Sequence, residues 1–129
     1  MDYDKLQHSK SLILYHIILV TKYRHKILNI LNVKQIFRDI ENKSKFVILE
    51  MEVDVDHIHF LIQSIPTLSI SQIIRRLKQE STIRIWQKYS DILSNYFWRN
   101  RILWSRGYFA CTIGNVSKEM IIKYIQLQG

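Results

Sequence analysis

The chain has 129 residues, of which 47% are hydrophobic and 23% charged, and its formal net charge is +8. This length fits one globular domain, and a composition with only 3 Gly and 1 Pro excludes a largely disordered or linker-rich chain. The longest apolar run, 12–20, contains His16 and is far shorter than the roughly 18 residues that a membrane span requires.

The first half of the chain alternates between strand and helix patterns. Residues 12–23 are β-branched and aromatic, which is typical of a central strand. Asn32 can cap a helix after it, because apolar residues then recur at helical spacing: Val33, Ile36, Phe37 and Ile40. Period two returns over 46–56, and a strand over 57–63 follows almost directly, which predicts an antiparallel hairpin.

The second half repeats the helix and strand order. Pro66 ends the hairpin, and Ser69 or Ser71 can cap a long helix over about 70–90. A strand over about 102–113, a turn over 114–117 and a final helix over about 118–128 complete the chain. The order predicts a single α+β domain over 1–129, a ferredoxin-like or RRM-like antiparallel sheet with helices on one face and an added C-terminal helix.

The positive charge lies mainly in the second half. Residues 61–129 contain ten Lys or Arg and three Asp or Glu, whereas residues 1–60 are nearly balanced. A basic field of this kind concentrates polyanions, and nucleic acid is the commonest polyanion in a cell. The one cysteine, Cys111, cannot form an internal disulfide, which predicts a cytoplasmic protein.

Two histidines stand in a strand pattern where valines would be usual. His57 and His59 are two residues apart, so their side chains point to the same face of a strand, about 6.6 Å apart along it. Two imidazole nitrogens can then converge on one divalent metal ion. By spacing alone, two ordinary strand histidines are the commoner interpretation.

A second pair of interest lies near the C-terminus. Tyr124 and Gln128 are four apart and therefore share one face of the predicted last helix. A tyrosine can be a nucleophile and a glutamine a metal ligand, although a tyrosine at this spacing is more often a core residue and a terminal glutamine is more often solvated.

The chain closely resembles the single-tyrosine HUH transposases of the 200/605 family of small insertion sequences. The matching segments follow in order over nearly the whole chain: Tyr15–Arg24, Asp56–His59, Arg75–Lys78, Leu103–Phe109, Gly114–Ser117 and Lys123–Gln128. One departure precedes the histidines, where Val55 stands at a position that is often proline in this family.

The resemblance implies a role for each matching residue. His57, His59 and Gln128 match the family's ligands for a catalytic Mg²⁺ or Mn²⁺, and Tyr124 matches the nucleophile. Tyr124 would attack a phosphate of single-stranded DNA and form a 5′-phosphotyrosine link, leaving a free 3′-hydroxyl on the other fragment. The 3′-hydroxyl of a second strand could then reverse the reaction and join a different partner.

The resemblance also implies the partners. Family members are homodimers that bind hairpins at the ends of single-stranded DNA, and the turn over 114–117 would position the tyrosine helix. The candidates for contact with DNA are the basic residues Lys22, Arg24, Arg75, Arg76, Lys78 and Arg106.

Two other functions fit parts of the pattern. A non-catalytic single-stranded nucleic-acid-binding module could use the same fold, but its strands would be expected to carry a Lys-Gly-Phe-Gly-Phe type of stacking motif, which this chain lacks. A related tyrosine nuclease that processes hairpins without transposition would share every catalytic residue.

Overall fold

The computed structural model describes residues 13–113, and the predicted final helix over 118–128 lies outside these residues. The strands are β1 (Ile13–Val20), β2 (Val47–Val53), β3 (His57–Ser64) and β4 (Phe109–Ile113). The α-helices are α2 (Val33–Asn42) and α3 (Ile70–Leu93), and short 3-10 turns occupy Lys22–Arg24 and Leu28–Ile30.

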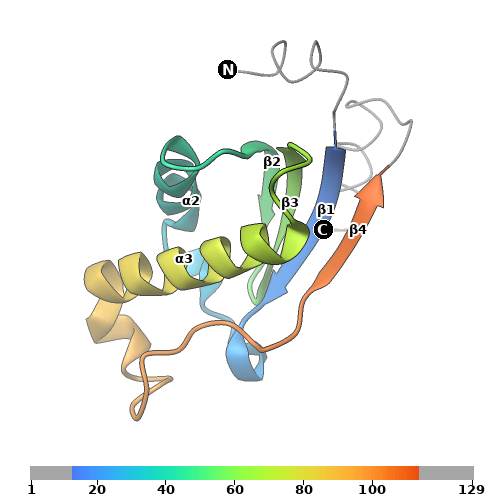
Figure 1. Cartoon of the computed structure of the whole chain (residues 1–129). Coiled ribbons are helices and arrows are strands. Elements are labelled where there is room, and N and C mark those ends of the chain that lie inside the picture. Colours follow the sequence, from blue (N-terminus) through green and yellow to red (C-terminus); the bar gives the residue numbers. More distant parts are fainter. Residues whose placement is uncertain (1–12, 114–129) are drawn as a thin grey trace.

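The four strands form one sheet in the order β2-β3-β1-β4, with every neighbouring pair antiparallel (Figure 1). The β2-β3 hairpin is joined by a short turn, as the alternating pattern predicts. β1 lies in the centre, where Ile17 pairs with Phe60 of β3 and with Ala110 of β4. This order confirms the predicted ferredoxin-like α+β arrangement.

Helices α2 and α3 pack on the same face of the sheet (Figure 1). The strands contribute alternate residues such as Ile17, Leu19 and Phe60 to the core between the layers, and these side chains are fully buried. Phe37 of α2 meets Phe60 of β3 edge to face, with ring centroids 4.8 Å apart. Burying one such phenylalanine contributes about 1.5–3 kcal/mol, so this contact anchors α2 to the sheet.

The two helices begin differently. The predicted apolar stripe of α2 is buried as expected, but the Asn32 side chain makes no capping hydrogen bond. Instead, the Asn32 backbone N–H donates to the Tyr89 hydroxyl, 3.0 Å away. For α3, Ser69 is the cap: its hydroxyl accepts from the Gln72 N–H at 3.2 Å, and the Gln72 side chain accepts from the Ser69 N–H at 2.8 Å.

The predicted strand over 102–113 was too long, because regular pairing starts only at Phe109. Before Phe109 the chain runs along α3, and side chains of α3 form hydrogen bonds with the polar groups of this segment. Trp104 forms an isolated bridge with Thr21, and its indole N–H donates to the Ser81 hydroxyl at 2.9 Å. These side-chain bonds replace a ladder and leave the segment irregular.

The predicted strand over 12–23 was also too long, since β1 ends at Val20. Tyr23 and Arg24 lie in the left-handed region, with φ of 59° and 53°. Side chains rarely adopt this conformation, and two consecutive residues in it cost roughly 1–3 kcal/mol each. Within residues 13–113, no helix is long and apolar enough to cross a membrane.

Candidate active site

His57 and His59 lie at the start of β3, on the face of the sheet opposite the core under α2 and α3. Their rings meet edge to face with centroids 4.8 Å apart. The strand alternation that predicts one shared face is therefore confirmed, whereas the metal role of the pair stays a prediction.

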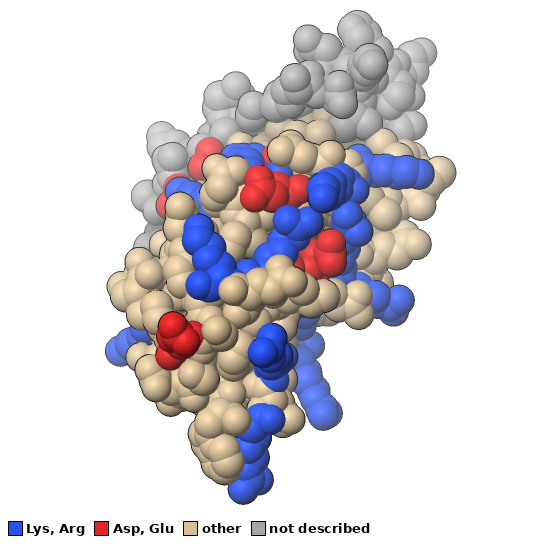
Figure 2. Space-filling view, turned by 90° about the vertical axis from the view of Figure 1, so that its left-hand side faces the viewer, with Lys and Arg blue, Asp and Glu red and all other residues tan. Residues whose placement is uncertain are grey.

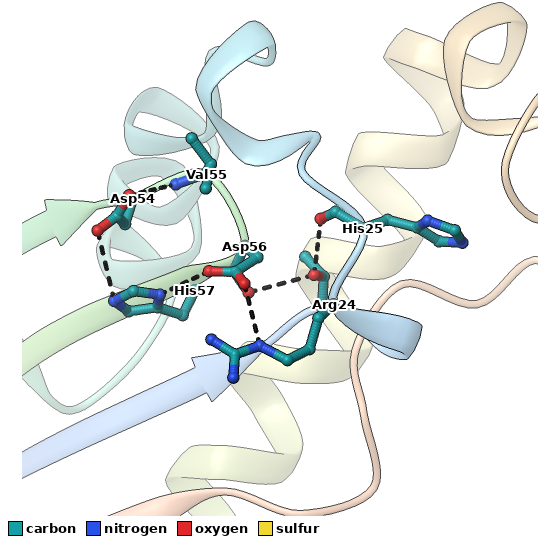
Figure 3. Close-up of polar contacts among 7 residues, drawn as sticks. Arg24, His25, Asp54, Val55, Asp56 and His57 are labelled. Atoms are coloured by element: carbon teal, nitrogen blue, oxygen red, sulfur yellow. Dashed lines mark hydrogen bonds and ion pairs between the residues drawn. The ribbon is translucent and has the colours of Figure 1, made fainter.

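A carboxylate holds the first imidazole in place (Figure 3). His57 Nδ1 is 2.8 Å from Asp56 Oδ1, and the other carboxylate oxygen accepts a hydrogen bond from Arg24 Nε at 3.0 Å. The hydrogen bond to His57, with that to Arg24, holds the pKa of Asp56 below its usual range. A hydrogen bond from His57 Nδ1 to an ionised Asp56 orients the ring and leaves Nε2 as the nitrogen directed away from Asp56.

Asp54 lies on the other side of the same ring. Its Oδ2 is 3.7 Å from His57 Nε2, and its Oδ1 accepts a hydrogen bond from the Val55 N–H at 2.7 Å (Figure 3). The Asp54 side chain is 37% exposed, so this carboxylate faces the solvent side of the site.

The second imidazole is buried against a third one. His59 is only 4% exposed, and its Nδ1 is 3.4 Å from Nε2 of His16 on β1. The two rings stack with centroids 5.5 Å apart. Burial, reinforced by the nearby His57 and His16, lowers the pKa of His59 to about 4, so the ring is neutral at physiological pH.

The remaining nitrogen of His59 is the one that matters for a metal. Nε2 is buried and has no hydrogen-bond partner in the part of the chain that the structure describes. A buried, neutral imidazole nitrogen without a partner is costly unless a ligand uses it. The unpartnered Nε2 is more consistent with a metal-binding histidine than with a histidine that only packs in a strand.

The described residues supply only part of a metal site. Within 13–113, no group of three or more His, Cys, Asp or Glu side chains could hold an ion. Two histidines therefore need further ligands, and both Gln128, the predicted third ligand, and Tyr124, the predicted nucleophile, lie outside the described residues.

The turn that carries Arg24 is tied to both sides of the site. The Thr21 N–H donates to the Asp56 carbonyl at 2.9 Å, and the Thr21 hydroxyl donates to the His25 carbonyl at 2.8 Å. The Lys22 N–H donates to the Leu103 carbonyl at 2.8 Å. These bonds hold the left-handed pair Tyr23 and Arg24 in place and aim the Arg24 guanidinium at Asp56.

The other predicted DNA contacts differ in their exposure and in whether they are hydrogen-bonded to the chain itself. Arg75 and Arg106 are exposed, and Lys22 is half-buried. The guanidinium of Arg76 donates to the Lys43 carbonyl at 2.9 Å and also to Ser44. The Lys78 ammonium donates to the carbonyls of residues 105–107 at 2.9–3.1 Å, so Arg76 and Lys78 are bound to their own chain.

Basic side chains are spread over the face in Figure 2, with acidic ones in a few separate places. Such a surface attracts a polyanion without specifying its sequence.

Sequence reasoning missed two residues near the histidine pair. Asp56 was noted only as part of a matching segment, although a carboxylate directly before a ligand histidine is a common way to orient it. His16 was seen only as an interruption of an apolar run. Its position on a central strand was the available signal, because a histidine there needs a polar neighbour across the ladder.

The chain matches the family model described as "Transposase IS200 like" over residues 9–128. It is 34% identical to the transposase of insertion sequence element IS200 from Salmonella typhimurium, an alignment that covers 98% of this chain and 84% of the relative. It is 32% identical to the ISDra2 transposase TnpA from Deinococcus radiodurans, over 88% of this chain and 82% of that protein. The chain belongs to the IS200/IS605 family of tyrosine transposases.

Solved structures show the same fold. A crystal structure of a Deinococcus radiodurans R1 protein assigned as a transposase superposes with a TM-score of 0.70 and 28% identity, covering 91% of both chains. A REP-associated tyrosine transposase bound to a REP hairpin has a TM-score of 0.64 at 13% identity, over 90% of this chain and 66% of that one. At that identity the second likeness concerns the fold alone.

Proposed function

We propose that this transposase is a metal-dependent DNA strand transferase that cuts and rejoins single-stranded DNA at insertion-sequence ends. The observation that carries the proposal is the state of the histidine pair. His57 is oriented through Nδ1 by Asp56, and His59 is buried with Nε2 unpartnered among the described residues. Two imidazoles on one face of a strand, each with its Nε2 not used by a hydrogen bond within the described residues, form a half-site for a divalent cation.

The proposed cofactor is Mg²⁺ or Mn²⁺, held by His57 and His59 with Gln128 as a third protein ligand. When bound, such an ion polarises a phosphate and stabilises the charge that develops on it. Asp56 keeps the His57 ring oriented, and its hydrogen bonds with His57 and Arg24 lower the pKa of Asp56.

Tyr124 is the proposed nucleophile. Its hydroxyl oxygen forms a bond to phosphorus while the bond between phosphorus and the 3′-oxygen breaks, and the proton lost by the tyrosine is balanced by the one gained at the 3′-hydroxyl. The product is a 5′-phosphotyrosine, and a 3′-hydroxyl of another strand reverses the step with a new partner. The energy of the phosphodiester is kept in the covalent link, so no nucleotide cofactor is required.

The proposed substrate is single-stranded DNA with hairpin ends, and the proposed assembly is a homodimer in which the tyrosine helix of one chain can complete the site of the other. The net charge of +8 and the exposed Arg75 and Arg106 support binding to a polyanion.

An oligonucleotide assay tests this function. Labelled single strands from both flanks of the gene are incubated with the full chain and Mn²⁺ and run on a denaturing gel. A metal-dependent protein–DNA adduct is expected, and it should be absent with Tyr124→Phe although that variant still binds the DNA. Hairpin binding without any adduct would instead favour a non-catalytic binding protein.

A further inference from the structure

Aromatic side chains are exposed on two neighbouring segments at one end of the molecule. Tyr23 is 72% exposed in the turn after β1, and Trp98 is 73% exposed in the loop after α3. The two segments are joined by the hydrogen bond from the Lys22 N–H to the Leu103 carbonyl. Large aromatic rings that are exposed close together commonly mark a surface that binds another molecule.

A shallow depression lies between these rings. Its volume is about 300 Å³. The lining residues come from both segments: Tyr23, Tyr96, Phe97, Trp98, Arg99, Asn100 and Ile102. We call this depression, with His25 beside it, the Tyr23/Trp98 surface. Its walls are ring faces and edges, so a flat aromatic molecule fits it better than an aliphatic side chain does.

Cations accompany the rings. The Arg99 guanidinium carbon is 4.6 Å from the centroid of the Trp98 ring, and Lys22 Nζ is 5.4 Å from that of Tyr23. The His25 ring is 5.1 Å from Tyr96 and 5.9 Å from Tyr23. A cation beside each exposed ring is suited to a partner that alternates flat bases with phosphates.

The two segments that form this surface are basic. Neither 21–38 nor 92–113 contains an Asp or Glu, whereas the two segments include Lys26 and Arg101 in addition to the cations at the rings. Asp56, the carboxylate that Arg24 contacts, is paired with that arginine. An excess of basic side chains favours a polyanion as the partner over a protein surface of mixed charge.

The Tyr23/Trp98 surface is connected to the histidine pair. Tyr23 precedes Arg24, whose guanidinium bonds Asp56, which in turn bonds His57. Two hydrogen bonds, from Arg24 to Asp56 and between Asp56 and His57, therefore join the residue next to Tyr23 to the histidine pair.

We propose that the Tyr23/Trp98 surface is a base-stacking site for single-stranded DNA, in which Trp98 and Tyr23 stack on unpaired bases and Arg99 contacts the backbone. The inference rests on the proposed function for its substrate class, but it adds a binding surface that the histidines, Tyr124 and the basic candidates named above do not include. Duplex DNA does not satisfy this surface, because its bases are stacked on one another.

Tryptophan fluorescence gives a direct test, since Trp86 and Trp104 are 5% and 7% exposed while Trp98 is 73% exposed. The full chain carrying Tyr124→Phe is titrated with oligothymidylate in a metal chelator, so neither cleavage nor the metal site contributes. Oligothymidylate should quench the emission, and an abasic strand of equal length and charge should not. Equal quenching by both strands would overturn the proposal.

Affinity gives the second measurement, by anisotropy of a labelled oligothymidylate. Trp98→Ala should weaken binding about tenfold, the loss of one stacked base, and Trp98→Phe should retain most of the affinity while losing the quenching. Ile83→Ala is the matched control, because Ile83 is 53% exposed on α3 and does not line the depression. An unchanged affinity for Trp98→Ala, or tighter binding of a duplex than of the single strand, would refute base stacking here.

The two proposals fail separately. A covalent adduct at Tyr124 without Trp98 quenching would keep the strand transferase and remove the stacking site. Quenching lost in Trp98→Phe, without any adduct in the unmodified chain, would keep the stacking site and remove the transferase.

Discussion

Asp56 Oδ1 lies 2.8 Å from His57 Nδ1, and the same carboxylate accepts from Arg24 Nε at 3.0 Å. This arrangement determines which nitrogen of His57 can bind a metal. It also links the strained turn at Tyr23 and Arg24 to the histidine pair, so the strain has a function if Asp56 orients a ligand.

Asp56→Asn should weaken Mn²⁺ binding by about 10- to 100-fold, because the amide does not fix the His57 tautomer as an ionised carboxylate does. Isothermal titration calorimetry of the full chain measures the change. Asp91→Asn, on an exposed position of α3, is the matched control and should bind Mn²⁺ as the unmodified chain does. Equal affinities for both variants would show that Asp56 does not position a ligand.

The free energy of unfolding should fall as the pH is lowered from about 6.5 to about 4, the range in which His59 stays neutral in the folded chain but not in the unfolded one. The unfolded imidazole takes up a proton near pH 6.5, whereas the folded one does so only near a pKa of about 4. Below about pH 6.5 the unfolded state therefore gains protons that the folded state does not, and stability is lost toward pH 4, by at most about 3 kcal/mol.

Urea unfolding at a series of pH values measures this slope without added metal. His59→Gln removes the titrating group and should give a shallower loss of stability over the same pH range. The same slope in both proteins would mean that His59 is not the group responsible.

Lys78→Met should destabilise the fold by about 1–3 kcal/mol, because three carbonyls of residues 105–107 lose a charged donor. Partial burial also lowers the pKa of Lys78, which indicates that its ammonium is partly removed from solvent. Thermal unfolding compares it with Lys34→Met on the exposed side of α2. Equal stability of the two variants, with a loss of DNA binding only for Lys78→Met, would instead make Lys78 a DNA contact.

Ser69→Ala should cost about 1 kcal/mol of stability, since it removes the hydroxyl that caps α3. Ser71→Ala, two residues later and exposed, is the internal control and should change little. Chemical denaturation of both variants decides between the two serines, which the sequence pattern left as alternatives. A larger effect at Ser71 would contradict the observed capping box.

Much of the fold follows from local patterns. The helical stripe ending at Ile40 and the strand alternation around His57 and His59 each reflect one buried face, so their elements were predicted within a few residues. The apolar pattern of residues 102–108 was misleading, because Leu103 and Trp104 are buried by packing near α3, and among the described residues only an isolated bridge between Trp104 and Thr21 pairs this segment with another. Residues buried by packing against a helix and residues buried in a sheet show the same apolar pattern in the sequence.

The site was predictable to a different degree. The spacing of the two histidines predicts their shared face, but the environment of each ring comes from distant residues. His16 reaches His59 from 43 positions away, and Arg24 reaches Asp56 from 32 positions away. No local period encodes such pairs, since they depend on strand order and on a turn with an unusual backbone conformation.

The central claim is that Tyr124 carries the DNA after cleavage. The most direct measurement is mass spectrometry of the chain after incubation with a single-stranded end and Mn²⁺, followed by nuclease trimming and peptide mapping. A nucleotide mass on the peptide that contains Tyr124, lost when His57 and His59 are both replaced by alanine, is the expected result. A nucleotide mass on another residue such as Tyr108, or an adduct that survives loss of both histidines, would contradict it.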